Sequence, residues 1–283
     1  MTTAPPRGLT WRLLDKRAED IPVPAGEARP PAALDRATGR GVRVCVVDSG
    51  VEGGHPRVGP VNGSWAVVRN DAGLEVEETD TVDLCGHGTA CASIIRRVAP
   101  DCEVHSVRVL GERFSGTGDI LLEGLRWAVA QGFDLINMSL STTRSRFAED
   151  LHALTDEAYF HGSVIVASAH NSPVESFPWR FASVISVGSH GEDDPVHLYN
   201  PQPPVEFFAP GQNIEVGWLG GTTIRSTGNS FATPYITGLC ARILSASPRM
   251  TPFQLKSALY ACAANVHERS DVPGTDAPDS DAP

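Results

Sequence analysis

Long apolar runs are missing from this chain of 283 residues, and its first residues lack the apolar core of a secretory signal. No run approaches the roughly 20 residues that a membrane-spanning helix needs, so we expect no membrane partner. Without a signal for export, we expect a cytoplasmic protein. Positive charge is also scarce, because 34 Asp and Glu outnumber 23 Lys and Arg and leave a net charge of −11. Nucleic acids and anionic membranes bind positive surfaces, so this balance argues against both as partners.

Cysteines at metal-ligand spacing are missing too, since none of the six forms a Cys-x-x-Cys pair. In a cytoplasmic chain we expect reduced thiols, several of them packed as small apolar side chains. The sequence therefore predicts no metal site, and nothing in it indicates a cofactor. The six are Cys45, Cys85, Cys91, Cys102, Cys240 and Cys262.

The chain does contain a regular alternation of short apolar runs and amphipathic stretches. The runs predict strands over 42–47, 104–109, 135–139, 164–169 and 184–187. The amphipathic stretches predict helices over 89–97, 120–131, 148–161, 230–245 and 251–264. Such an alternation is typical of an α/β fold in which helices cover both faces of a mostly parallel sheet.

The two ends of the chain differ from this pattern. Residues 1–31 are rich in proline and have few periodic apolar positions, so we expect an arm there. Residues 270–283 are acidic and proline-rich and contain nothing that would form a core, which predicts a disordered tail. One domain over 32–269 remains.

Three short segments carry residues suited to catalysis. Asp48 ends an apolar strand, where the carboxyl ends of parallel strands form a ligand crevice. His87 lies between two glycines at a predicted helix start, and Ser230 opens a long apolar helix, whose free N–H groups favour negative charge. Each residue alone also fits a structural role: a turn former, a surface cap and a helix N-cap.

Together, in the order Asp, His, Ser, the segments Asp48–Gly50, Gly86–Ala90 and Gly228–Pro234 resemble the three motifs of subtilisin-like serine peptidases. Those motifs read D-[ST]-G, H-G-T and G-T-S-x-[AS]-x-P, and the resemblance runs from about residue 32 to 264. It implies a three-layer subtilisin-like fold and a serine endopeptidase that cleaves proteins or peptides. Asp48, His87 and Ser230 would form its catalytic triad.

The resemblance also implies an oxyanion donor and a substrate cleft. Residues 164–171 look like the family's strand that ends in an asparagine, here Asn171, whose amide would stabilise the transition-state oxygen. Two segments look like the edges that hold an extended peptide through main-chain hydrogen bonds, although both also fit plain loops. They comprise Ser115, Gly116 and Thr117 on one side, and Ser139, Leu140 and Ser141 on the other.

Acidic residues near the expected pockets suggest a substrate preference. The resemblance places Glu175 and Ser176 near the floor of the primary specificity pocket and Asp119 near the rim of an outer pocket. An acid at either place would favour Lys or Arg in the substrate through charge pairing. Glu175 equally fits a side chain that points to solvent.

The chain departs from the family pattern in several places. Asn229 replaces the threonine that often assists the oxyanion, and its amide either does the same or plays no part. His170 replaces a small residue, so it would crowd the primary pocket, bond a substrate or titrate near neutral pH. Cys91 resembles a free thiol of the proteinase K branch. Between Ile95 and Val104 the chain is too short for the family's calcium-binding loop.

Two other functions stay open at this point. A transpeptidase or macrocyclase uses the same triad but lets an amine intercept the acyl-enzyme. A non-catalytic pseudoprotease would bind peptides without cutting them. A regulatory partner is unknown, but residues 19–24 resemble the N-terminal extension of intracellular subtilisins, in which a proline segment lies across the active site. The same residues fit a stiff surface arm.

Overall fold

A nine-stranded sheet crosses the centre of the fold in this computed structural model, which describes residues 23–24, 34–192 and 194–267. The strand order is β4-β3-β5-β2-β6-β7-β8-β10-β9. All neighbours from β3 to β10 are parallel, and the two edge strands are antiparallel to them. The strands are β2 (Arg43–Asp48), β3 (Gly63–Asn70), β4 (Gly73–Glu78), β5 (Glu103–Arg108), β6 (Leu135–Met138), β7 (Val164–Ser168), β8 (Ile185–His190), β9 (Leu198–Tyr199) and β10 (Phe207–Pro210).

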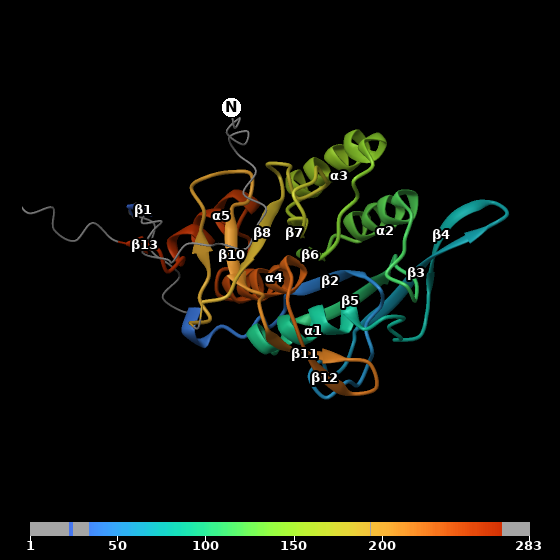
Figure 1. Cartoon of the computed structure of the whole chain (residues 1–283), viewed down its shortest axis with the longest axis horizontal. Helices are drawn as coiled ribbons and strands as arrows, with labels where there is room; N and C mark the ends of the chain where they lie inside the picture. The colour runs from blue at the N-terminus through green and yellow to red at the C-terminus, as the bar shows by residue number, and fades with distance from the viewer. Residues whose placement is uncertain (1–22, 25–33, 193, 268–283) are drawn as a thin grey trace, which may run out of the picture.

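Helices cover both faces of this sheet (Figure 1). α1 and α4 pack on one face and α2 and α3 on the other, each over its own apolar core. β2 supplies both cores, because successive side chains of a strand point to opposite faces. Val44 and Val46 enter the first core, whereas Cys45 and Val47 enter the second. The helices are α1 (His87–Val98), α2 (Gly118–Ala130), α3 (Ala148–Phe160), α4 (Asn229–Ala246) and α5 (Pro252–Ala261), with 3₁₀ turns at Leu34–Arg36 and Ser145–Phe147.

These three layers confirm the predicted α/β class and the mostly parallel sheet. Each predicted strand and helix is present, with its ends shifted by a few residues at most. The link from α1 to β5 is only a turn over 99–102, as the short sequence there indicated. The sequence did not predict the hairpins β3–β4 and β11 (Ile214–Trp218) with β12 (Thr222–Ser226), nor the buried strand β10 and its antiparallel neighbour β9.

The β11–β12 hairpin lies against the first turns of α1. Val216 packs with Ala90 and Ile94 of α1 in a small apolar cluster. Trp218 approaches the backbone before the helix so closely that a Cβ on Gly86 would lie 2.7 Å from Trp218 Cε2. The hairpin therefore fixes the position at which α1 begins.

A second short pairing lies at the end of the molecule beyond α5 (Figure 1). There β1 (Val23–Pro24) pairs in parallel with β13 (Val266–His267). Of the segment 19–24, only these two residues are described, and they pair with β13 and not with the cleft described below. Residues 19–22 and the predicted tail over 270–283 lie outside the described residues. None of the described helices has the length and apolar character to cross a membrane.

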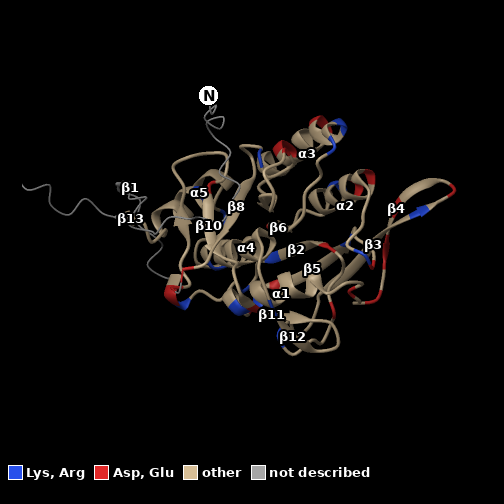
Figure 2. Cartoon of the chain, in the orientation of Figure 1, with Lys and Arg blue, Asp and Glu red and all other residues tan. Residues whose placement is uncertain are grey.

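Acidic side chains gather over β4 and the segment that follows it (Figure 2). Glu75, Glu77 and Glu78 lie exposed on this edge strand, and Asp80 follows them. Because an edge strand offers unpaired backbone groups to other chains, charged side chains along it oppose edge-to-edge association.

Candidate active site

Three of the four residues singled out by the sequence motifs line one cleft, and the fourth lies buried beside it. His87, Asn171 and Ser230 line a cleft of about 580 Å³, and Asp48 is bonded directly to His87. Asp48 ends β2, Asn171 follows β7, and the two other residues open α1 and α4. The cleft thus forms at the carboxyl ends of parallel strands, where α/β sheets bind ligands.

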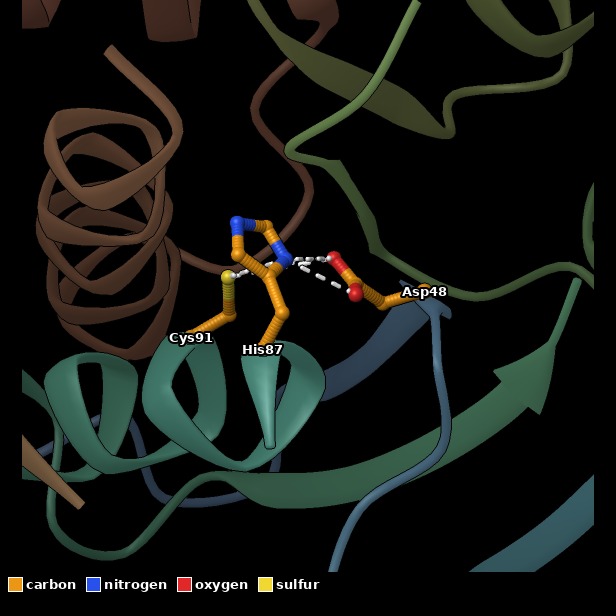
Figure 3. A group of neighbouring side chains, drawn as sticks. All are labelled: Asp48, His87 and Cys91. Carbon is orange, nitrogen blue, oxygen red and sulfur yellow. Dashed lines mark hydrogen bonds and ion pairs between the residues drawn. The ribbon is translucent and has the colours of Figure 1, made fainter. Parts of the chain in front are cut away.

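Asp48 and His87 form a buried pair (Figure 3). The ring Nδ1 of His87 lies 2.8 Å from Oδ1 and 2.9 Å from Oδ2 of the carboxylate. The backbone N–H of Ser49 donates to the same Oδ1 at 2.8 Å. Because a carboxylate only accepts hydrogen bonds, Nδ1 carries the proton and Nε2 keeps its lone pair.

The charge of Asp48 governs the protonation of His87. Burial lowers the pKa of His87, but the nearby Asp48 carboxylate and its hydrogen bond raise it by more. The net result is a pKa of His87 well above its ordinary 6.5. Asp48 therefore stabilises the imidazolium that forms when His87 accepts a proton.

Asp83 holds the first turn of α1. Gly86, the residue before the helix, has a left-handed conformation (φ 90°) and no side chain to cap the N–H groups. Asp83 takes that role, accepting from Gly86 N at 2.8 Å, Thr89 N at 2.8 Å and Thr89 Oγ1 at 2.7 Å. It also accepts from Ser49 Oγ at 2.8 Å, and Ser49 Oγ accepts from Gly88 N at 3.0 Å. This network joins the end of β2 to the start of α1, and the sequence analysis missed it.

Ser230 and Asn171 border the same small space. Asn171 Oδ1 accepts from Asn229 N at 2.9 Å, so the amide Nδ2 is free to turn to the cleft. A Cβ on Gly228 would lie 3.3 Å from Ser230 Oγ and 3.5 Å from Asn171 Nδ2. Glycine at 228 therefore leaves room where the hydroxyl and the amide converge.

The side chain of Asn229 forms hydrogen bonds with neighbouring segments of the chain and does not line the cleft. Its side chain is buried, and Oδ1 accepts from Ser189 N at 2.9 Å and Ser189 Oγ at 2.8 Å. Its Nδ2 donates to the carbonyl of Ala169 at 3.2 Å and to that of His170 at 3.3 Å. Of the two predicted roles, the structure favours the one without oxyanion contact: Asn229 ties the start of α4 to β7 and β8.

Most of the predicted substrate edges face the cleft. Gly116 and Thr117 line one side, and Ser139, Leu140 and Ser141 line the other. Ser115 is exposed and does not line the cleft, and its carbonyl accepts from Gly111 N at 2.9 Å. His170 lines the cleft as well, with Nδ1 3.0 Å from Ser172 N.

The structure does not place Glu175 and Ser176 on the pocket floor. Glu175 has a side chain that is 63% exposed, lies outside the cleft lining and forms an ion pair with Arg180. Ser176 is fully buried behind the wall, where its hydroxyl is 3.1 Å from Ser141 Oγ and accepts from Trp179 Nε1 at 2.8 Å. The expected acidic floor is therefore wrong, because the charge of Glu175 is turned outward and neutralised.

The carboxylate of Asp119 also has a charged partner within the protein. It lies in the first turn of α2 and forms an ion pair with Arg69 of β3. Hydrogen bonds from Thr117 and Arg69 lower the pKa of Asp119 to about 2. Its charge therefore already has a partner from β3, which weakens the expected preference for Lys or Arg at the outer pocket.

Cys91 lies one helical turn from His87, and its sulfur lies beside the His87 ring, on the side away from Asp48 (Figure 3). Its Sγ is 3.9 Å from His87 Nδ1 and from Asp48 Oδ2. Burial raises the pKa of the Cys91 thiol, which keeps it protonated and a poor nucleophile. In the described part of the chain these three side chains form the one cluster at metal-ligand spacing. Two of its members already satisfy each other, since His87 Nδ1 donates to Asp48.

Comparisons with known proteins agree with this geometry. A family model described as "Subtilase family" matches residues 39–278. Subtilisin E of Bacillus subtilis (strain 168) is 30% identical over 264 residues, covering 87% of this chain and 67% of its own. Subtilisin Savinase of Lederbergia lenta is 29% identical over 262 residues, covering 88% and 93%. A solved structure of a cold adapted subtilisin-like serine proteinase superposes with a TM-score of 0.68 at 29% identity, covering 87% of this chain and 89% of that one. The chain therefore belongs to the subtilase family and is a serine-type endopeptidase.

Proposed function

We propose that the chain hydrolyses peptide bonds of proteins or peptides through an acyl-enzyme on Ser230. Asp48, His87 and Ser230 form the triad, and Asn171 supplies an oxyanion donor. The observation that carries this assignment is the buried bond from His87 Nδ1 to Asp48. It leaves a basic Nε2 on a residue that lines the same cleft as Ser230.

Each residue has a defined part in the reaction. Ser230 Oγ attacks the substrate carbonyl while His87 Nε2 accepts the hydroxyl proton, and Asp48 stabilises the imidazolium. The carbonyl oxygen becomes negative and is bound by Asn171 Nδ2 and by the N–H of Ser230 at the start of α4. His87 then gives its proton to the leaving amine. A water molecule attacks the acyl carbonyl in the same way and releases the acid.

Cleavage of an unbiased peptide library by the purified protein tests this proposal. The wild-type chain should yield new termini. The Ser230→Ala variant should lose about 10⁶-fold in kcat, the loss known for the serine of a subtilisin, and should melt at the wild-type temperature. Phenylmethylsulfonyl fluoride should modify Ser230, as read by peptide mass spectrometry.

The products also separate the two alternatives. A transpeptidase or macrocyclase would give ligated or cyclic products when an acceptor amine is added. A pseudoprotease would bind library peptides and leave them intact. Cleavage by Ser230→Ala at the wild-type rate would overturn the proposal.

A further inference from the structure

Phe114 has a conformation that a bulky residue rarely takes. It lies between β5 and α2 with φ 54°, in the left-handed region that favours glycine. Its side chain is 49% exposed, so little core packing offsets the cost of that conformation. A strained backbone with a half-exposed ring points to a role outside folding.

The ring of Phe114 covers His87. The two ring centroids are 5.0 Å apart and the rings meet edge to face at 76°, with both residues lining the cleft. A closed turn holds the loop, since Gly111 N donates to the Ser115 carbonyl at 2.9 Å and Phe114 N donates to the Gly111 carbonyl at 3.1 Å. Leu110 lines the cleft next to them. Phe114 is therefore a fixed part of the wall beside His87.

Successive side chains of an extended peptide point to opposite sides, and this alternation identifies the substrate residue that meets the wall formed by Phe114. We call the residue whose carbonyl is attacked the acyl residue, and the one before it the preceding residue. If the acyl side chain enters the part of the cleft between Ser139–Thr142 and Ser168–Asn171, the preceding side chain points to the opposite side. His87, Leu110 and Phe114 line the same cleft, and we infer that they form that side.

We propose that Phe114 determines specificity by filling the space beside His87, so that only a small side chain fits at the preceding residue. Gly, Ala and Ser fit there, whereas Leu, Phe and longer side chains meet the ring. This inference rests on the proposed function, because it assumes that an extended substrate is attacked by Ser230.

Two peptides that differ only in Ala or Leu at the preceding residue test the proposal. Wild type should cleave the Ala peptide with a kcat/KM at least tenfold above that of the Leu peptide. Phe114→Gly suits the left-handed backbone and removes the ring, so this ratio should fall to within about twofold of one. Phe160→Gly is the matched control, since Phe160 ends α3 with an 81% exposed side chain away from the cleft.

A binding assay separates this proposal from the proposed function. In the Ser230→Ala background the Kd of the same two peptides should show the wild-type preference for Ala, and adding Phe114→Gly should remove it. If Ser230→Ala cleaves the peptides, the proposed function fails first. If Ser230→Ala is inactive but Phe114→Gly keeps the full preference, or wild type accepts Leu as well as Ala, the role of Phe114 is overturned.

Discussion

At the scale of single residues, the proposed mechanism makes the pair of His87 and Asp48 set the pH at which the reaction runs. His87 must be neutral to accept the Ser230 proton, and its pKa lies well above 6.5. We therefore expect kcat/KM to rise with pH through a midpoint above 6.5 and to level off at alkaline pH. A pH profile on a small peptide checks this.

The charge of Asp48 raises the pKa of His87 and thereby the midpoint of the pH profile, so the Asp48→Asn variant provides the control. It removes the charge that raises the pKa of His87 and leaves burial, which lowers it. The amide also permits the wrong tautomer of His87, with the proton on Nε2. The equivalent change in a chymotrypsin-type triad lowers kcat about 10⁴-fold. A wild-type midpoint at or below 6.5 would contradict the expected balance.

Asn171 gives a second prediction at this scale. Its Oδ1 is held by Asn229 N, so Asn171→Ala removes the cleft-facing amide and leaves one backbone N–H without that partner. We expect kcat to fall about 10²–10³-fold, the range known for the same donor in a subtilisin, with KM nearly unchanged. Asn70→Ala, at the exposed end of β3 and outside the cleft lining, is a suitable control. An equal loss in both variants would argue against an oxyanion role.

The predicted site residues that the structure brings together are those that short motifs carry. Asp48, His87, Asn171 and Ser230 are each flanked by turn or helix-start residues that mark their place in the fold. For Glu175 the sequence left both directions open, because the direction of its side chain depends on Arg180, a partner that no local pattern reveals.

Phe114 was missed for a related reason. Its significance lies in a backbone angle and in the contact with His87, and neither can be read from a loop sequence.

At the scale of elements, the first turn of α1 depends on Asp83. Its carboxylate accepts from Ser49 Oγ and from the N–H groups of Gly86 and Thr89. Asp83→Asn would turn an N–H toward these donors, and a buried donor left unpaired costs about 1–3 kcal/mol. We expect the free energy of unfolding to fall by about 2–3 kcal/mol and kcat to fall at least tenfold, because His87 begins this helix.

Urea unfolding and steady-state kinetics measure the two effects of Asp83→Asn. Asp71→Asn is the matched control, since Asp71 lies exposed in the β3–β4 turn. If Asp83→Asn lowers stability but leaves kcat and the pH profile unchanged, Asp83 supports the fold without positioning His87.

The kinds of element that were predicted follow from their burial. Parallel strands such as β2 and β7 are buried on both faces and form continuous apolar runs. The hairpins β3–β4 and β11–β12 are half exposed and carry mixed side chains such as Glu75, Arg225 and Thr223. Their pairing depends on contacts with α2 and α1, which a local pattern does not contain.

At the scale of the whole molecule, the resemblance extends over one continuous sheet and both of its helical layers. The candidate site is assembled from segments far apart in sequence, since β2, α1, the segment after β7 and α4 each supply one residue. The predicted domain limits, the tail over 270–283 and the cytoplasmic location stay predictions.

Three buried histidines link stability of the whole fold to pH. Burial lowers the pKa of His105, His190 and His197 below 6.5. Unfolding restores their ordinary pKa, so below pH 6.5 the unfolded chain binds protons that the folded chain does not. The contribution of these three histidines to stability is therefore fully present above pH 6.5 and is lost as pH falls from there, whereas His87, with its raised pKa, contributes in the opposite direction. Urea unfolding at pH 8 and pH 5, in the Ser230→Ala variant to prevent self-cleavage, measures the loss.

His105→Phe isolates one of these contributions. His105 lies on β5, near Arg43 and Glu103, with its ring 4.9 Å from that of Phe133. Neither ring nitrogen of His105 has a hydrogen bond, and the one charged contact is that of Nε2 with Glu103 Oε2 at 3.7 Å, so a phenyl ring loses only this contact and cannot bind a proton. The variant should lose less stability than its parent between pH 8 and pH 5. His161→Phe, at the exposed end of α3, is the matched control and should keep the parental loss, because it changes an exposed side chain outside the apolar cores. An unaltered pH dependence in His105→Phe would show that His105 does not contribute to the acid sensitivity of the fold.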